Sequence, residues 1–146
     1  MKNILWITNI LMPDVEEKLG LPKSVVGGWM EGMLIHLKKN PNINLAVASV
    51  SNVTELKIFS ENNVQYFVLP SHGKVSKYSN HLYKHWKDVN RLFKPDLVHV
   101  HGTEYAHGLA MMDCLPELKY VVSIQGLVSI YARYYFAGIS NRNVIR

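Results

Sequence analysis

Short runs of almost wholly apolar residues recur along the chain and are separated by longer segments of mixed polarity. The first run, residues 3–8 with the sequence NILWIT, shows no alternation of apolar and polar positions. Such runs are typical of strands that are covered on both faces of a sheet. The pattern predicts five strands, at residues 3–8, 44–50, 64–69, 97–101 and 119–125.

The segments between these runs mostly carry apolar residues at helical spacing. From Tyr78 to Phe93, for example, the apolar residues keep to one helical face and the lysines to the others. Spacing and capping residues predict helices at residues 26–39, 54–61, 78–93, 105–114 and 127–137, although several residues of the last segment would also suit a strand. Asn9 to Ser24 is polar and contains two prolines, so we expect a long loop there.

The alternation of strands and helices predicts the fold class. It is typical of βαβ units with right-handed crossovers, so we expect a single α/β domain over residues 1–146. The expected architecture is a doubly wound, mainly parallel Rossmann-like sheet of about five strands with helices on both faces. In the strand order 3-2-1-4-5 the order reverses between the first and fourth strands, and ligands bind at the carboxyl ends there.

Polar residues follow the fourth predicted strand at this reversal. They are His101, Gly102, Thr103 and Glu104, and we predict that they line a site. His99 lies on the same strand face as His101, so both could reach one metal ion. No third ligand has convincing local spacing, although His107 or Glu104 could fold back to join them. We therefore predict no metal site, assign His99 to packing, and expect the His101 side chain to face the pocket.

Glycines mark two further positions at the same expected edge of the sheet. Gly27 and Gly28 precede the first predicted helix, where free N–H groups and the helix dipole favour an anion such as a diphosphate. A G-x-G-x-x-G fingerprint is absent, and a flexible connection explains the pair equally well. Gln125 and Gly126 end the fifth strand, where a turn-permitting glycine is the alternative. Neither a P-loop nor a Ser-His-Asp arrangement is recognisable.

Composition and charge narrow the class of protein. Hydrophobic residues make up 48% of the chain, a globular composition, and the one cysteine, Cys114, excludes an internal disulfide. No apolar run approaches the ~20 residues of a membrane span and no cleavage-site pattern follows Met1, so we expect a cytoplasmic protein. The net charge of +5 is concentrated in residues 74–94. A solvated helix face or contact with an anionic membrane explains this cluster, and nucleic acid is not implied.

Four stretches of the sequence resemble a known family. They are residues 3–8, 26–31 (VGGWME), 95–102 (PDLVHVHG) and 121–126 (VVSIQG). In this order they resemble the N-terminal domain of family-four retaining glycosyltransferases of the GT-B fold, and residues 95–102 are the most specific part of the match. The resemblance covers essentially the whole chain.

The resemblance implies a hexosyltransferase of polysaccharide biosynthesis, without a cofactor or an obligatory metal. It would transfer a sugar from a nucleotide-sugar donor to a saccharide or lipid-linked acceptor, with peripheral contact at the inner membrane face. By analogy residues 101–104 and Gln125 would bind substrate, and Gly27 and Gly28 would lie near the donor diphosphate. Many relatives carry an active-site histidine at the position of Gln125. Glutamine does not titrate, so an acid–base role there is supplied elsewhere or the activity is altered.

The resemblance also predicts what the chain lacks. The sequence stops before the donor-binding half, so we expect an inactive fragment of the parent enzyme, and apolar residues near 124–139 predict self-association. A non-catalytic interaction module that presents its basic face to a partner remains an alternative. An independent nucleotide-binding Rossmann-like protein is a third reading, against which the missing glycine fingerprint argues.

Overall fold

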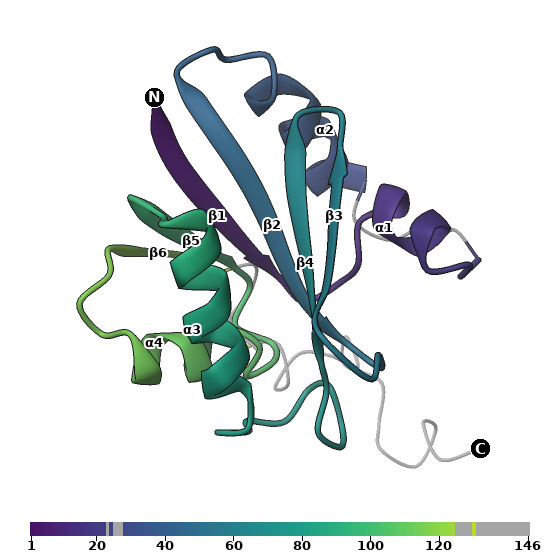
Figure 1. The fold of residues 1–146 in the computed structure, drawn as a ribbon, viewed down its shortest axis with the longest axis vertical. Helices are drawn as coiled ribbons and strands as arrows, with labels where there is room; N and C mark the ends of the chain where they lie inside the picture. The colour runs from purple at the N-terminus through teal and green to yellow at the C-terminus, as the bar shows by residue number, and fades with distance from the viewer. Residues whose placement is uncertain (23, 25–27, 125–129, 131–146) are drawn as a thin grey trace.

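A six-stranded sheet forms the centre of the computed structural model, which describes residues 1–22, 24, 28–124 and 130 (Figure 1). The strands are β1 (Lys2–Thr8), β2 (Ile43–Ser51), β3 (Lys57–Glu61), β4 (Val64–Pro70), β5 (Leu97–His101) and β6 (Tyr120–Ser123). Their order is β3-β4-β2-β1-β5-β6, and every neighbouring pair is parallel except β3 with β4. The order expected for the five predicted strands is confirmed, with β1 between β2 and β5.

One strand was not predicted: β3 lies where the sequence pattern predicted a helix over residues 54–61, so that prediction is wrong. Lys57–Glu61 instead forms β3, which pairs antiparallel with β4. Asn62 and Asn63 join the two strands with φ angles of 51° and 63°, both positive as in a type I′ hairpin turn. Asparagine tolerates this conformation, so the turn and the strand pairing outweigh the weak local preference for a helix.

A second prediction also needs correction. The segment from Asn9 to Ser24, expected to be a long loop, contains helix α1 (Pro13–Lys18). Proline stands in the first turn of this helix, and Asp14 and Glu16 complement the positive end of its dipole. Met12 and Val15 are buried beneath it. Burial of these two side chains holds a helix that is too short to be stable alone.

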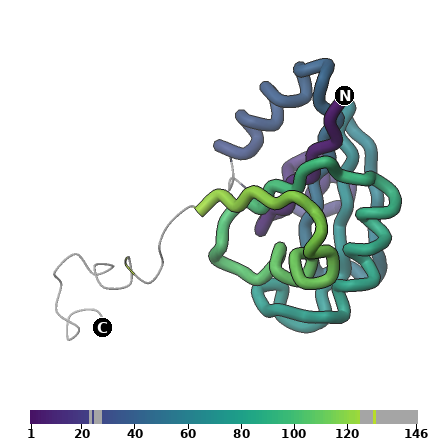
Figure 2. Tube along the Cα trace, turned by 90° about the vertical axis from the view of Figure 1, so that its left-hand side faces the viewer, coloured from purple at the N-terminus to yellow at the C-terminus, as the bar shows by residue number. Residues whose placement is uncertain are grey.

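Helices cover both faces of the sheet, as expected. Besides α1 they are α2 (Gly28–Leu37), α3 (Leu82–Phe93) and α4 (Leu109–Cys114). The buried side chains of α1 and α2 belong to one core and those of α3 and α4 to the other, with the sheet between them (Figure 2). Both α3 and α4 begin later than the predicted starts at Tyr78 and Tyr105. The described architecture is an α/β sheet compatible with a Rossmann-like fold.

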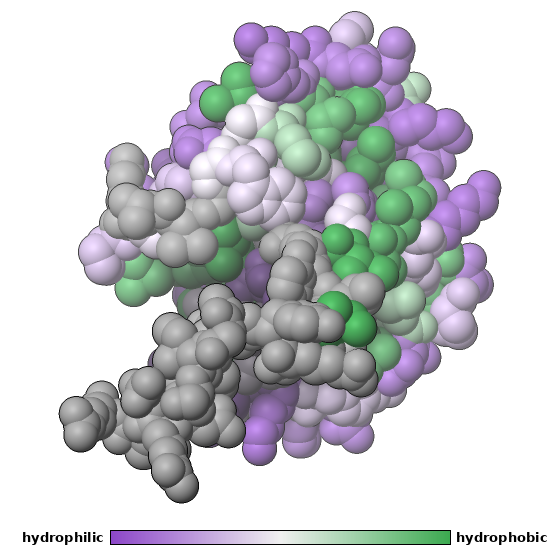
Figure 3. All heavy atoms as spheres, turned by 180° about the vertical axis from the view of Figure 1, so that it is seen from behind, coloured by the Kyte–Doolittle hydropathy of each residue, from purple (hydrophilic) through white to green (hydrophobic). Residues whose placement is uncertain are grey.

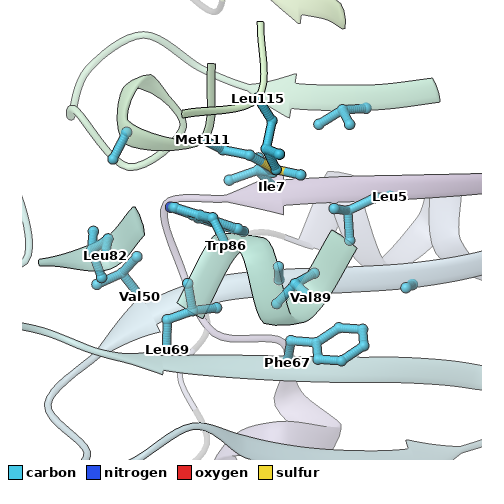
Figure 4. Packing of buried hydrophobic residues seen from close by; sticks show 14 of the residues in the cluster. Leu5, Ile7, Val50, Phe67, Leu69, Leu82, Trp86, Val89, Met111 and Leu115 are labelled. Atoms are coloured by element: carbon cyan, nitrogen blue, oxygen red, sulfur yellow. The ribbon is translucent and has the colours of Figure 1, made fainter. Parts of the chain in front are cut away.

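The core beneath α3 and α4 is built from one face of each central strand. Trp86 and Val89 point from α3 toward the sheet, where Leu5 and Phe67 lie (Figure 4). All four side chains are fully buried. Met111 of α4 joins the same cluster. This continuous packing fixes both helices, and the loops that precede them, relative to the ends of the strands.

The described helices cover the opposite face less completely. Trp6 of β1 packs with Met30 and Leu34, which are buried residues of α2. Met33 of α2 and Val121 of β6 are 38% and 46% exposed, and hydrophobic atoms, drawn green, are visible on this side of the molecule (Figure 3). The predicted helix at residues 127–137 lies almost wholly outside the described residues. No helix within the described ranges is long and apolar enough to span a membrane.

We predict that two identical substitutions in α3 differ sharply in their effect on stability. Leu82→Ala removes a side chain that is 3% exposed and packed in the core, so it should lower the free energy of unfolding by about 2–5 kcal/mol. Leu92→Ala, at a position that is 50% exposed, should change it by about 0.5 kcal/mol or less. Urea unfolding measures both, and equal losses would contradict the assigned core face of α3.

Candidate functional site at the carboxyl edge of the sheet

The carboxyl ends of β1 and β5 lie side by side, where the strand order reverses. Thr8 is in register with His101. The hydroxyls of Thr8 and Ser49 are 2.7 Å apart, and both contact the carbonyl oxygen of Ile10. These buried contacts hold the chain where it leaves β1, so the first loop departs from a fixed point beside the end of β5.

Gly102 shapes the turn that follows β5. Its φ angle is +84°, a conformation that favours glycine, and its N–H donates to the carbonyl of Ser123 at 2.8 Å. A Cβ at this position would collide with the carboxylate of Glu104, which lies over the glycine. Gly102 therefore allows the chain to turn and the Glu104 carboxylate to approach the end of the strand.

A pocket of about 470 Å³ opens beside this turn. Its wall includes Gly102, Thr103, Glu104, Leu109, Met112 and Val122. The loop contributes a hydroxyl and a carboxylate, whereas α4 and β6 contribute apolar side chains. The structure thus brings three of the predicted site residues, at positions 102–104, around one pocket.

The His101 side chain lies on the other face of the sheet and does not line this pocket. It is 1% exposed, and its ring packs against Trp6, His99 and Trp29 at centroid distances of 4.5, 4.0 and 5.8 Å. Neither ring nitrogen has a hydrogen-bond partner in the described part of the chain. Burial, reinforced by His99 and His107, lowers the pKa of His101 to about 4. We expected this side chain to face the pocket, but alternation along β5 turns it toward α2.

His99 is the partnered histidine of the two. Its Nε2 lies 2.6 Å from Oγ of Ser123, so it ties β5 to β6. Burial lowers its pKa. No group of three histidine, cysteine, aspartate or glutamate side chains that could hold a metal ion occurs among the described residues.

His107 supports the loop, a role that no sequence pattern indicates. Its side chain is 2% exposed, and its Nε2 lies 3.1 Å from the carbonyl oxygen of His101, to which it donates. Burial lowers the pKa of His107. At Gly108 an added Cβ would lie 2.7 Å from Cγ1 of Val100. The histidine and the glycine therefore hold the loop tightly against β5. The spacing of His107 and Gly108 from their partners in β5 matches no recognisable sequence motif.

The first residue of α2 reaches the same edge of the sheet. Gly28 begins the helix and is exposed, with no atom within 4 Å of an added Cβ. Its neighbour Trp29 contacts His101, which puts the start of α2 beside the end of β5. Gly27 and Gln125 lie outside the described residues.

A second pocket, of about 490 Å³, lies at the ends of β2 and β4. Its wall includes Asn52, Ser71, Lys74, Ser76 and Tyr105. Asn52 and Ser71 directly follow their strands, as the predicted site residues follow β5. The same signal in the sequence could therefore have indicated this pocket. Tyr105 lines both pockets, so the two are neighbours.

These groups can recognise a polar ligand with an apolar face. The carboxylate of Glu104 and the hydroxyl of Thr103 can hydrogen-bond to ligand hydroxyls, while Tyr105, Leu109 and Met112 offer apolar surface. No protein-family model matches the chain, and no curated protein matches its sequence.

We predict opposite effects of a glycine-to-alanine substitution at two positions. Gly102→Ala imposes a left-handed backbone on alanine and displaces Glu104, so it should destabilise the protein by about 1–2 kcal/mol. Gly32→Ala, inside α2 and with no atom near an added Cβ, should stabilise it by about 0.5–1 kcal/mol. Urea unfolding measures both changes, and a stabilising Gly102→Ala would contradict the described turn.

We also predict that the burial of His101 makes stability depend on pH. Its pKa is about 4 when folded against an ordinary 6.5, so between these values only the unfolded chain takes up the proton. The free energy of unfolding should be highest above pH 6.5 and fall by on the order of 2–3 kcal/mol as the pH drops to about 4. His99 and His107, with lowered pKa values, add to the same slope.

The matched variants His101→Phe and His36→Phe separate this contribution from the rest. Phenylalanine at position 101 removes a titrating group, so the loss of stability between pH 6.5 and 4 should become smaller. His36 is exposed on α2, so His36→Phe is the control for replacing a histidine outside the buried cluster. Urea midpoints across this pH range provide the measurement, and the same slope in His101→Phe as in the unaltered chain would refute the assignment.

Proposed function

We propose that this chain is the acceptor-side domain of a glycosyltransferase of the GT-B type. The parent enzyme would transfer a hexose from a nucleotide-sugar to a saccharide or lipid-linked acceptor, and this chain alone would be inactive. One observation carries the proposal: Gly102, Thr103 and Glu104 surround a pocket at the carboxyl end of β5, beside the reversal of strand order.

The chemistry of this pocket suits a sugar. Saccharides present hydroxyl groups around a ring whose C–H faces are apolar, and the pocket combines a carboxylate and a hydroxyl with aliphatic and tyrosine surface. Glu104 accepts hydrogen bonds from hydroxyl groups and disfavours an anion at the same point. Its role here is to orient the acceptor, and a catalytic role is not assigned to it.

The start of α2 supplies the donor side of the proposal. Gly28 leaves the first turn of this helix open, and Trp29 puts that turn next to His101. Free N–H groups at a helix start favour a diphosphate, so this end of α2 would face the donor in the parent enzyme.

A peripheral contact with an anionic membrane forms part of the same proposal. Lys84, Lys87 and Arg91 are exposed on α3, opposite the buried side of the helix. Their positive charge would hold a membrane-bound acceptor near the pocket.

A non-catalytic interaction module is the second candidate function. Trp29 and Met33 of α2 and Val121 of β6 leave apolar side chains exposed on one side of the sheet, as a protein-binding surface would. In this reading the apolar surface is the functional one, and sugars would not bind near Glu104.

Binding of saccharides to the chain tests the proposal. Titration of a panel of mono- and disaccharides should shift the NMR amide signals of residues 102–109, and UDP- and GDP-sugars should bind weakly. Glu104→Gln removes a charged hydrogen-bond acceptor and should weaken saccharide binding about tenfold or more.

Glu117→Gln is the matched control, because Glu117 is exposed and lies outside the wall of the pocket. It should bind saccharides as the unaltered chain does. Saccharides that shift no signals in residues 102–109 would contradict the proposal and favour the interaction module. Tight binding of a nucleotide-sugar in their place would favour an independent nucleotide-binding protein.

A further inference from the structure

The second pocket lies where two parallel strands end together. Asn52 follows β2 and Ser71 follows β4, and the N–H of Ser71 donates to the carbonyl of Ser51 at 2.8 Å. This hydrogen bond fixes the two strand ends beside each other. The pocket therefore has a rigid base that belongs to the sheet.

The outer wall of this pocket comes from two loops that are bonded to each other. The N–H of Lys77 donates to the carbonyl of Lys74 at 2.9 Å, which closes a turn in the loop between β4 and α3. The N–H of Ala106 donates to the carbonyl of Ser76 at 3.3 Å and joins this turn to the loop that follows β5. The two loops thus form one connected wall, although a long stretch of sequence separates them.

The described wall of this pocket carries a positive charge. Lys74 is the charged residue of the described wall, and no described carboxylate forms an ion pair with it. The same wall includes Asn52, Ser71, Ser76 and Tyr105, whose amide and hydroxyl groups are neutral donors. A single ammonium group among several O–H and N–H donors is suited to a phosphate.

The neighbouring pocket has the opposite character. Glu104 gives it a negative charge, and Tyr105 forms the shared boundary. One ligand that spans both pockets would therefore have its hydroxyl groups near Glu104 and its anionic group near Lys74. This polarity fixes the direction in which an elongated ligand lies along the edge of the sheet.

We propose that the pocket around Lys74 binds a phosphate group of the acceptor, which identifies the acceptor as a phosphorylated saccharide. The assignment rests on the proposed function, because the saccharide itself occupies the pocket around Glu104. The phosphate can belong to a soluble sugar phosphate or to a lipid headgroup, and the interacting groups of the protein are the same in both cases.

Titration with inorganic phosphate at constant ionic strength tests the site directly. Phosphate should shift the NMR amide signals of Asn52, Ser71 and Ser76, and Lys74→Met should weaken its binding at least tenfold. Lys119→Met is the matched control, since this exposed lysine precedes β6 at the opposite end of the strands. Equal binding by Lys74→Met and the unaltered chain, or shifts scattered over all exposed lysines, would overturn the assignment.

Comparison of glucose with glucose 6-phosphate separates this inference from the proposed function. Shifts in residues 102–109 by both sugars, with additional Lys74-dependent shifts by the phosphate, support both. If neither sugar shifts the signals of residues 102–109 but the Lys74-dependent shifts are present, the proposed function is overturned. If both sugars shift residues 102–109 but the Lys74-dependent shifts are absent, the phosphate site is overturned.

Vesicles distinguish the two sources of the phosphate group. Lys74-dependent sedimentation with vesicles that contain phosphatidic acid, and not with phosphatidylcholine alone, would support a lipid headgroup. Lys74-dependent binding of glucose 6-phosphate without such sedimentation would support a soluble acceptor. A third outcome would overturn the assignment. In it, Lys74→Met still binds vesicles, replacement of Lys84, Lys87 and Arg91 by glutamate abolishes vesicle binding, and no phosphate binds near Ser71.

Discussion

The pairing of β1 with β2 on one side and β5 on the other is the constraint on which the rest of the structure depends. Leu5 and Ile7 of β1 are fully buried on one face and Trp6 is nearly so on the other, so this strand cannot slip without exposing both cores. The register puts Thr8 opposite Ser49 and His101. The loops after β1, β2 and β5 therefore begin from fixed points, and Gly102 decides where the carboxylate of Glu104 lies.

The sequence alone predicted those parts of the fold that follow from local patterns. The strand at residues 97–101 has the same bounds in the structure, and the order of the five predicted strands follows from alternation and handedness. The segment that forms strand β3 was predicted to be a helix, because its pairing depends on two asparagines with positive φ angles. Helix α1 was missed because buried Met12 and Val15 stabilise it, which is tertiary packing that a short polar segment does not reveal.

The candidate site was likewise predicted only where local sequence patterns determine it. Polar residues after a buried strand indicated residues 102–104, and the structure puts them around one pocket. The direction of the His101 ring depends on how α2 packs against β5, and the contribution of His107 depends on a loop that folds back on the strand. The pocket at Lys74 required the hydrogen bond between Ala106 and Ser76, whose partners are far apart in sequence. Such contacts leave no periodic signal.

The two edges of the sheet differ in how they would meet another strand. At the β3 edge charged residues are paired, Lys57 with Glu55 and Glu61 with Lys18, and such charges discourage association of strands. At the β6 edge Val121, Val122 and Ile124 are 46%, 39% and 60% exposed. Among the described strands, β3 therefore carries charges that oppose pairing with a further strand, whereas β6 carries apolar side chains that would pack with one.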